Sequence, residues 1–162
     1  MNFKRSFLFL FVLACVGCEE PKKPQPLLHV NKEQPKLSED IATLQKELSE
    51  LDTDAYVEAY IIRIINEGSK GTLGFSGGVM DAGFATPEDA PNIARYVMSL
   101  SKRQSSDAAL GAKSELFYTS NCGGCHGNDG KGLGGAFPDL TLKRYVGLEK
   151  RKAFLEMKLG SL

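Results

Sequence analysis

Apolar residues recur at every third or fourth position through most of the chain after residue 37. Five stretches show this spacing, namely 38–51, 54–67, 87–100, 112–120 and 148–159. Such spacing places the apolar side chains on one face of an α-helix. No stretch shows the two-residue alternation that is typical of a half-buried strand. The pattern therefore predicts a small all-α domain.

Local signals indicate where these helices begin and end. Ser38 is predicted to cap the first helix and Asp54 the second, while Gly68 suits the end of the second helix. The run from Thr86 to Asp89 combines a hydroxyl, a proline and two acids, which favours the start of the third helix. Residues 68–85 contain six glycines, so we expect a loop that turns tightly or approaches a flat ligand closely.

The first eighteen residues have the pattern of an export signal. A basic start precedes the apolar run Phe7 to Ala14, which is shorter than the roughly 20 residues that span a bilayer. The small residues before Cys15 and Cys18 resemble a bacterial lipobox, in which the cysteine after the cut becomes lipidated. We expect an exported protein on the periplasmic side of a bacterial membrane, lipid-anchored through Cys15 or Cys18. Ordinary cleavage without lipidation is the alternative.

The rest of the chain divides by composition into a tether, two helical segments and a linker. Residues 19–37 contain four of the seven prolines and many charges, which predicts an extended flexible tether. His29 lies in this tether, where no neighbour has ligand spacing, so a metal role is not expected. Residues 38–101 form one helical segment, 102–111 a polar linker and 112–162 a second segment. Acidic and basic residues balance at 20 each and Trp is absent, so nothing indicates a nucleic-acid partner.

The second segment contains the motif that carries chemistry. Cys122, Cys125 and His126 form a C-x-x-C-H sequence, the attachment signature of c-type haem. Two thiols at this spacing can add to the two vinyl groups of one porphyrin, and the adjacent imidazole is a good axial ligand for the iron. We therefore expect one covalent haem c.

Zinc binding and dithiol redox chemistry also use paired cysteines at this spacing. Structural zinc needs four ligands, and the other candidates, Cys15, Cys18 and His29, lie in the signal or the tether. A dithiol centre of the thioredoxin type is expected in a βαβ context, which the pattern lacks. Both alternatives fit less well than haem.

Residues 115–132 resemble the cytochrome c family, in particular the cytochrome c domains of subunit III of cbb3-type cytochrome c oxidases. The resemblance implies that the carbonyl of Pro138 accepts a hydrogen bond from the second ring nitrogen of His126. Residues 55–101 are similar to the other half of such a domain, which bears the distal methionine. Met80 is thus the candidate sixth ligand, although the family expects Met-Pro and this chain has Met80 followed by Asp81.

The order of these two halves departs from the family. No C-x-x-C-H motif precedes residue 55, and only Met157 follows His126 as a weaker candidate ligand. One explanation is a degenerate first domain followed by a truncated haem domain. The explanation that we favour is a single rearranged cytochrome, in which residues 87–100 and 112–121 cross to close the haem crevice. A domain-swapped dimer would make the same contacts between chains.

The expected function is single-electron transfer between redox proteins of a respiratory chain, with a terminal oxidase as one possible partner. Haem carries this chemistry without a catalytic side chain, so an enzyme activity is not required. A five-coordinate haem acting as a peroxidase or gas sensor is the alternative, and a truncated relic of an oxidase subunit is a third interpretation.

Overall fold

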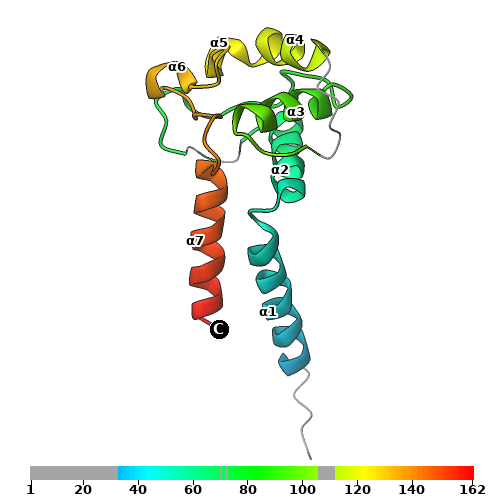
Figure 1. Cartoon of the computed structure of the whole chain (residues 1–162). Helices are drawn as coiled ribbons and strands as arrows, with labels where there is room; N and C mark the ends of the chain where they lie inside the picture. The colour runs from blue at the N-terminus through cyan, green and yellow to red at the C-terminus, as the bar shows by residue number, and fades with distance from the viewer. Residues whose placement is uncertain (1–32, 70, 72, 106–111) are drawn as a thin grey trace, which may run out of the picture. The chain divides into compact units, whose positions relative to one another are not determined.

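The computed structural model describes residues 33–69, 71, 73–105 and 112–162 (Figure 1). In chain order its helices are α1 (Glu33–Glu50), α2 (Asp54–Glu67), α3 (Ala90–Leu100), α4 (Ala112–Asn121), α5 (Gly123–His126), α6 (Gly132–Gly135) and α7 (Val146–Gly160). The all-α prediction is confirmed, since no strand occurs in these ranges. None of their helices is long and apolar enough to cross a membrane.

The first two helices begin differently from the prediction. Helix α1 begins at Glu33, so Ser38 lies inside it and residues 33–37 are helical rather than an extended tether. Pro35 allows this because its missing N–H falls in the first turn, where no helical bond is lost. Thr53, not Asp54, caps α2, because its side chain accepts a 3.3 Å hydrogen bond from the backbone nitrogen of Tyr56.

Helix α3 starts later than the sequence indicates. Residues 86–89 form a turn in which the nitrogen of Asp89 donates to the Thr86 hydroxyl at 3.2 Å, and α3 begins at Ala90. Pro91 lies in its first turn. The capping signal is therefore used by the turn that precedes the helix.

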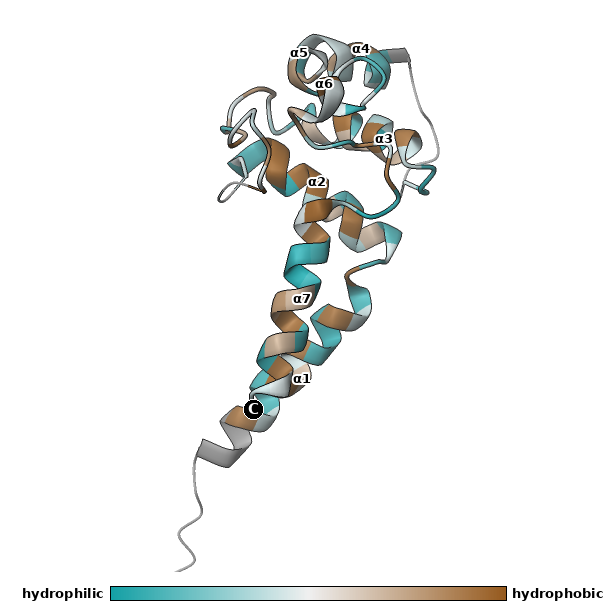
Figure 2. Ribbon diagram, turned by 90° about the vertical axis from the view of Figure 1, so that its left-hand side faces the viewer, coloured by the Kyte–Doolittle hydropathy of each residue, from teal (hydrophilic) through white to brown (hydrophobic). Residues whose placement is uncertain are grey.

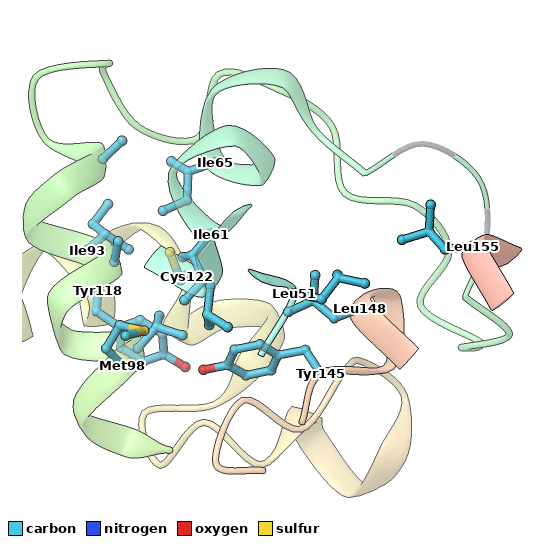
Figure 3. Packing of buried hydrophobic residues seen from close by; sticks show 14 residues of the cluster. Leu51, Ile61, Ile65, Ile93, Met98, Tyr118, Cys122, Tyr145, Leu148 and Leu155 are labelled. Atoms are coloured by element: carbon cyan, nitrogen blue, oxygen red, sulfur yellow. The ribbon is translucent and has the colours of Figure 1, made fainter. Parts of the chain in front are cut away.

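Helices α2, α3 and α4 form the main hydrophobic core. The buried side chains come mainly from α2 and α3, joined by one tyrosine of α4 and labelled in part in Figure 3: Val57, Ile61, Ile65, Ala90, Ile93, Ala94, Val97, Met98 and Tyr118. Helix α3 contacts both α2 and α4, and the rings of Tyr96 and Tyr118 lie with their centroids 4.8 Å apart. The segment 54–100 thus packs against the segment that begins at residue 112 within one chain, as the rearranged order expects.

Helices α1 and α7 form a second, antiparallel contact (Figures 1 and 2). Leu51, Leu148 and Leu155 are buried, and Figure 3 shows Leu155 apart from the side chains of the main core. The Arg151 guanidinium donates to both carboxylate oxygens of Glu47, at 2.8 and 2.7 Å. A hydrophobic strip and one ion pair therefore hold these two helices together.

Arg103 connects the two packed regions. It lies in the predicted polar linker but is only 6% exposed. Its guanidinium donates to the carbonyl of Lys143, to the carbonyl and carboxylate of Asp52, and to the carboxylate of Asp54. The start of the linker is thereby fixed to the junction of α1 with α2 and to the segment before α7.

Candidate haem site

The two cysteines and the histidine lie on one short helical turn. Helix α4 leads into it, with the nitrogen of Cys122 donating to the carbonyl of Tyr118 at 2.7 Å. The nitrogens of Cys125 and His126 donate to the carbonyl of Cys122 at 3.1 and 2.9 Å. This turn places Cys122 in the core and Cys125 at the surface. Burial, with a smaller contribution from Cys125, raises the pKa of the Cys122 thiol to about 11.

The imidazole of His126 is oriented by the carbonyl of Pro138, which lies 3.3 Å from its Nδ1 atom. With Nδ1–H donating to this carbonyl, Nε2 carries the lone pair that a metal ligand needs. Burial lowers the pKa of His126, and the hydrogen bond to Pro138 opposes this effect only in part. The ring is therefore neutral near pH 7, which is the form that binds iron.

The loop that carries Pro138 is shaped by close backbone contacts. Leu140 donates its N–H to the carbonyl of Gly130 at 2.7 Å, and Phe137 donates to Gly132 at 3.0 Å. Gly132 has a φ of 73°, and a Cβ atom there would lie 2.0 Å from the Phe137 oxygen. Only glycine fits at this point, and the resulting turn aims the carbonyl of Pro138 at His126.

These residues line one cavity of about 280 Å³, close to the lower end of the size range of small-molecule sites. Its walls are mainly apolar, with Ile61, Ile93, Val97, Tyr118, Leu140 and Tyr145 among the lining residues. Cys122, Cys125, His126 and Met80 lie on the same lining. The structure thus brings the C-x-x-C-H motif and the candidate sixth ligand to one apolar space, although Met80 lies 42 positions before Cys122. The carbonyl of Pro138 contacts the histidine from outside the motif.

The remaining candidate ligands are not at this cavity. Met157 lies on α7 with 65% of its surface exposed and does not line the cavity, so the structure does not support it as an axial ligand. Cys15, Cys18 and His29 lie outside the described residues. In the ranges that the structure covers, no three or more His, Cys, Asp and Glu side chains come close enough to hold a metal ion together.

Sequence reasoning missed the contacts of three residues that line the cavity, namely Ser69, Tyr118 and Phe137. The hydroxyl of Tyr118 donates to the carbonyl of Gly127 at 2.8 Å and closes the turn after His126. The ring of Phe137 lies 6.1 Å from that of His126, tilted by 57°. Ser69 contacts Met80, eleven positions along the chain. No periodic or spacing signal marks a contact between two loop residues of this kind.

Comparisons with known proteins find relatives of part of the chain. It is 42% identical over 79 residues to the cbb3-type cytochrome c oxidase subunit CcoP of Helicobacter pylori, a match that covers 47% of this chain and 27% of that subunit. It is 43% identical over 54 residues to the subunit of the same name from Rubrivivax gelatinosus, covering 33% of this chain and 17% of that protein. No family model matches the chain. No solved structure matches it either. The chain spans about a quarter of the Helicobacter subunit, and over part of its length it is related to subunits of a cytochrome c oxidase.

Proposed function

We propose that this chain is a monohaem c-type cytochrome that transfers single electrons. The observation that carries the proposal is the placement of Cys122, Cys125 and a Pro138-bound His126 on one apolar cavity. The residues present fit a haem, because the cavity offers two thiols, one neutral imidazole and an apolar surround to the same space. The partial identity to oxidase subunits supports the assignment.

When bound, haem supplies reversible exchange of one electron at its iron. The thiols of Cys122 and Cys125 would each add S–H across one vinyl group, forming two thioethers without an oxidant. The Nε2 atom of His126 would ligate the iron, while Pro138 holds the Nδ1 proton and fixes the ring plane. Apolar residues of α2 and α3 exclude water from the cavity. Together these residues would attach the haem, ligate its iron and keep water away from it.

Met80 completes the proposed ligand set. It lines the cavity that contains His126 and is partly buried, while its loop neighbour Val79 is 47% exposed. A thioether ligand raises the reduction potential relative to a second nitrogen ligand and closes the sixth position. With Met80 bound to the iron, no position would be open for peroxide or a gas. This ligation therefore favours electron transfer over the peroxidase or gas-sensing alternative.

The location and the partners are proposed from the sequence and from the names of the relatives. The export pattern of residues 1–18 and the cysteines at positions 15 and 18 support a lipid-anchored protein on the periplasmic side of a membrane. The relatives are named as subunits of a cbb3-type oxidase, which supports a terminal oxidase or another respiratory redox protein as partner. Mass spectrometry of the exported protein and of its Cys15→Ser and Cys18→Ser variants tests the anchor, since only one variant should lose the lipid mass.

Visible spectra of the exported protein, made with haem-maturation machinery, test the haem assignment. We expect a c-type reduced spectrum, haem that stays on the polypeptide after acid extraction, and one haem per chain. Cys122→Ala combined with Cys125→Ala should abolish covalent attachment. Met80→Ala should remove the methionine-to-iron charge-transfer band, whereas Met157→Ala should leave it in place. Absence of covalent haem from the wild type would refute the proposal.

A further inference from the structure

Both backbone polar groups of Met80 are bound by a single residue. The nitrogen of Ser69 donates to the Met80 carbonyl at 2.7 Å, and the nitrogen of Met80 donates to the Ser69 hydroxyl at 2.9 Å. Ser69 directly follows Gly68, whose own nitrogen donates to the carbonyl of Ile64 at 2.9 Å and ends α2. The backbone position of Met80 is therefore set by the end of α2 and not only by its own loop.

The contact between this helix end and Met80 leaves no space for a side chain. Gly68 has a φ of 76°, and a Cβ atom there would lie 2.6 Å from the Met80 oxygen and 3.0 Å from the nitrogen of Ala82. The backbone of residues 80–82 thus lies directly against the end of α2. Ile61, Ile64 and Ile65 of the same helix line the cavity. One rigid element consequently supplies both a wall of the cavity and the support of Met80.

We propose that Ser69 is a positioning residue that holds Met80 at the sixth coordination position, an inference that rests on the Met80 ligation proposed above. The Ser69 hydroxyl accepts the hydrogen bond from the Met80 N–H, and the structure shows this bond together with Met80 lining the cavity. Loss of the hydroxyl favours arrangements in which Met80 has moved away. Loss of one such bond shifts an equilibrium by between about twofold and tenfold.

The rate of carbon monoxide binding to the reduced, haem-loaded protein tests this inference, because an exogenous ligand binds only after Met80 detaches. Ser69→Ala should bind carbon monoxide between about two and ten times faster than the wild type, with a weaker methionine-to-iron band in the oxidised protein. Ser69→Thr keeps the hydroxyl and should restore the wild-type rate. Ser76 is an exposed serine of the same loop, and Ser76→Ala is the matched control with no expected change.

The outcomes separate this inference from the function on which it rests. A wild-type rate and band in Ser69→Ala would overturn the role of Ser69 while leaving Met80 as the ligand. A wild type without the band, which binds carbon monoxide as fast as Met80→Ala, would refute Met80 ligation itself. A fast Ser69→Ala that Ser69→Thr does not rescue would also overturn the inference, because the hydroxyl would not be the group that matters.

Discussion

The α1–α7 pair and the cavity region are held together by different kinds of contact. Buried Leu51, Leu148 and Leu155 hold the two helices, with the Glu47–Arg151 ion pair beside them. The cavity region instead relies on backbone hydrogen bonds between loops that are distant in sequence. The nitrogen of Gly77, for example, donates to the carbonyl of Ala136 at 2.8 Å.

This difference indicates which changes each region tolerates. A helix pair is stabilised by buried apolar area, and one side chain replaces another there if volume and polarity are kept. The cavity loops approach so closely that Gly68 and Gly132 leave no room for a Cβ atom beside the neighbouring backbone, and a Cβ atom at Gly77 would force the Phe137 ring to move. A Cβ atom would lie 2.3 Å from the ring of Phe137 at Gly77, 2.0 Å from the Phe137 oxygen at Gly132 and 2.6 Å from the Met80 oxygen at Gly68. Backbone position therefore matters more than side-chain volume in the cavity region.

Leu155→Ala should have the largest effect on stability, through the helix pair. Leu155 is 0% exposed, and truncation of a fully buried leucine costs about 3 kcal/mol. Chemical denaturation of the full chain, followed by far-ultraviolet circular dichroism, measures this loss. The haem spectrum should stay unchanged, because Leu155 is not part of the cavity lining.

The matched control for this change lies two residues along the same helix. Met157 is 65% exposed, so Met157→Ala should change the free energy of unfolding by less than about 0.5 kcal/mol. Equal losses for the two variants would mean that the buried contact between α1 and α7 does not contribute to stability.

Arg103→Lys should have the next largest effect, because Arg103 connects the two regions. Its side chain is only 2% exposed and donates to the Lys143 carbonyl through both Nε and Nη2. Lysine keeps the charge but lacks the planar guanidinium with its several N–H donors. Several of these hydrogen bonds are therefore lost, which lowers the free energy of unfolding by about 2 kcal/mol. The midpoint of denaturation should fall accordingly.

Arg144→Lys provides the comparison for Arg103. The side chain of Arg144 is 65% exposed and its nearest ion-pair distance, to Glu149, is 3.9 Å. This variant should denature like the wild type. A similar result for Arg103→Lys would show that the guanidinium does not connect the two regions.

The contrast between the regions also explains how much the sequence revealed. The five longer helices were predicted from apolar spacing, and the last of them was predicted at 148–159 against the observed Val146–Gly160. The short helices α5 and α6 were not predicted. Helix starts were less well predicted, because residue types that cap helices also occur in other places. Ser38 lies inside α1, and Asp54 binds the distant Arg103 instead of capping α2. Regular elements are thus encoded locally, whereas the choice of cap depends on tertiary contacts.

The candidate site was predictable only where a fixed spacing marks it. The C-x-x-C-H spacing indicated Cys122 and His126, and the family resemblance added Pro138, whose carbonyl the structure places beside the histidine. Ser69 and Arg103 carried no such signal, because their partners lie eleven or more positions away and are largely backbone atoms. Contacts of this kind follow from the folded backbone rather than from residue type.

Gly77→Ala should have a smaller effect on stability but a direct effect on the cavity. The added Cβ atom would meet the Phe137 ring at 2.3 Å, so this ring, which lines the cavity, must shift, at a cost of about 1.5 kcal/mol. We expect an altered haem spectrum together with this loss of stability. At Gly124 an added Cβ atom meets nothing within 4 Å, so Gly124→Ala should change neither property. An unchanged spectrum in Gly77→Ala would contradict the close approach of the two loops.

Glu47→Gln should have the smallest effect on the free energy of unfolding. This effect should be present near neutral pH and disappear in acid. The hydrogen bond from Arg151 holds the pKa of Glu47 below its ordinary value of 4.5. A carboxylate whose pKa is lowered by folding stabilises the protein above its unfolded pKa, and this contribution is lost as the pH falls through the lower folded value. Because the Glu47 and Arg151 side chains are 24% and 42% exposed, solvent screens the pair and the contribution is about 0.5 kcal/mol.

The difference in unfolding free energy between wild type and Glu47→Gln, measured at pH 7 and again at pH 3, isolates this contribution from the other carboxylates. We expect the wild type to be more stable at pH 7 and the two proteins to become nearly equal at pH 3. Added salt should reduce the gap at pH 7, since a partly exposed ion pair is screened. A gap that persists unchanged at pH 3 would show that Glu47 stabilises the helix pair through packing and its contact with Tyr56 rather than through charge.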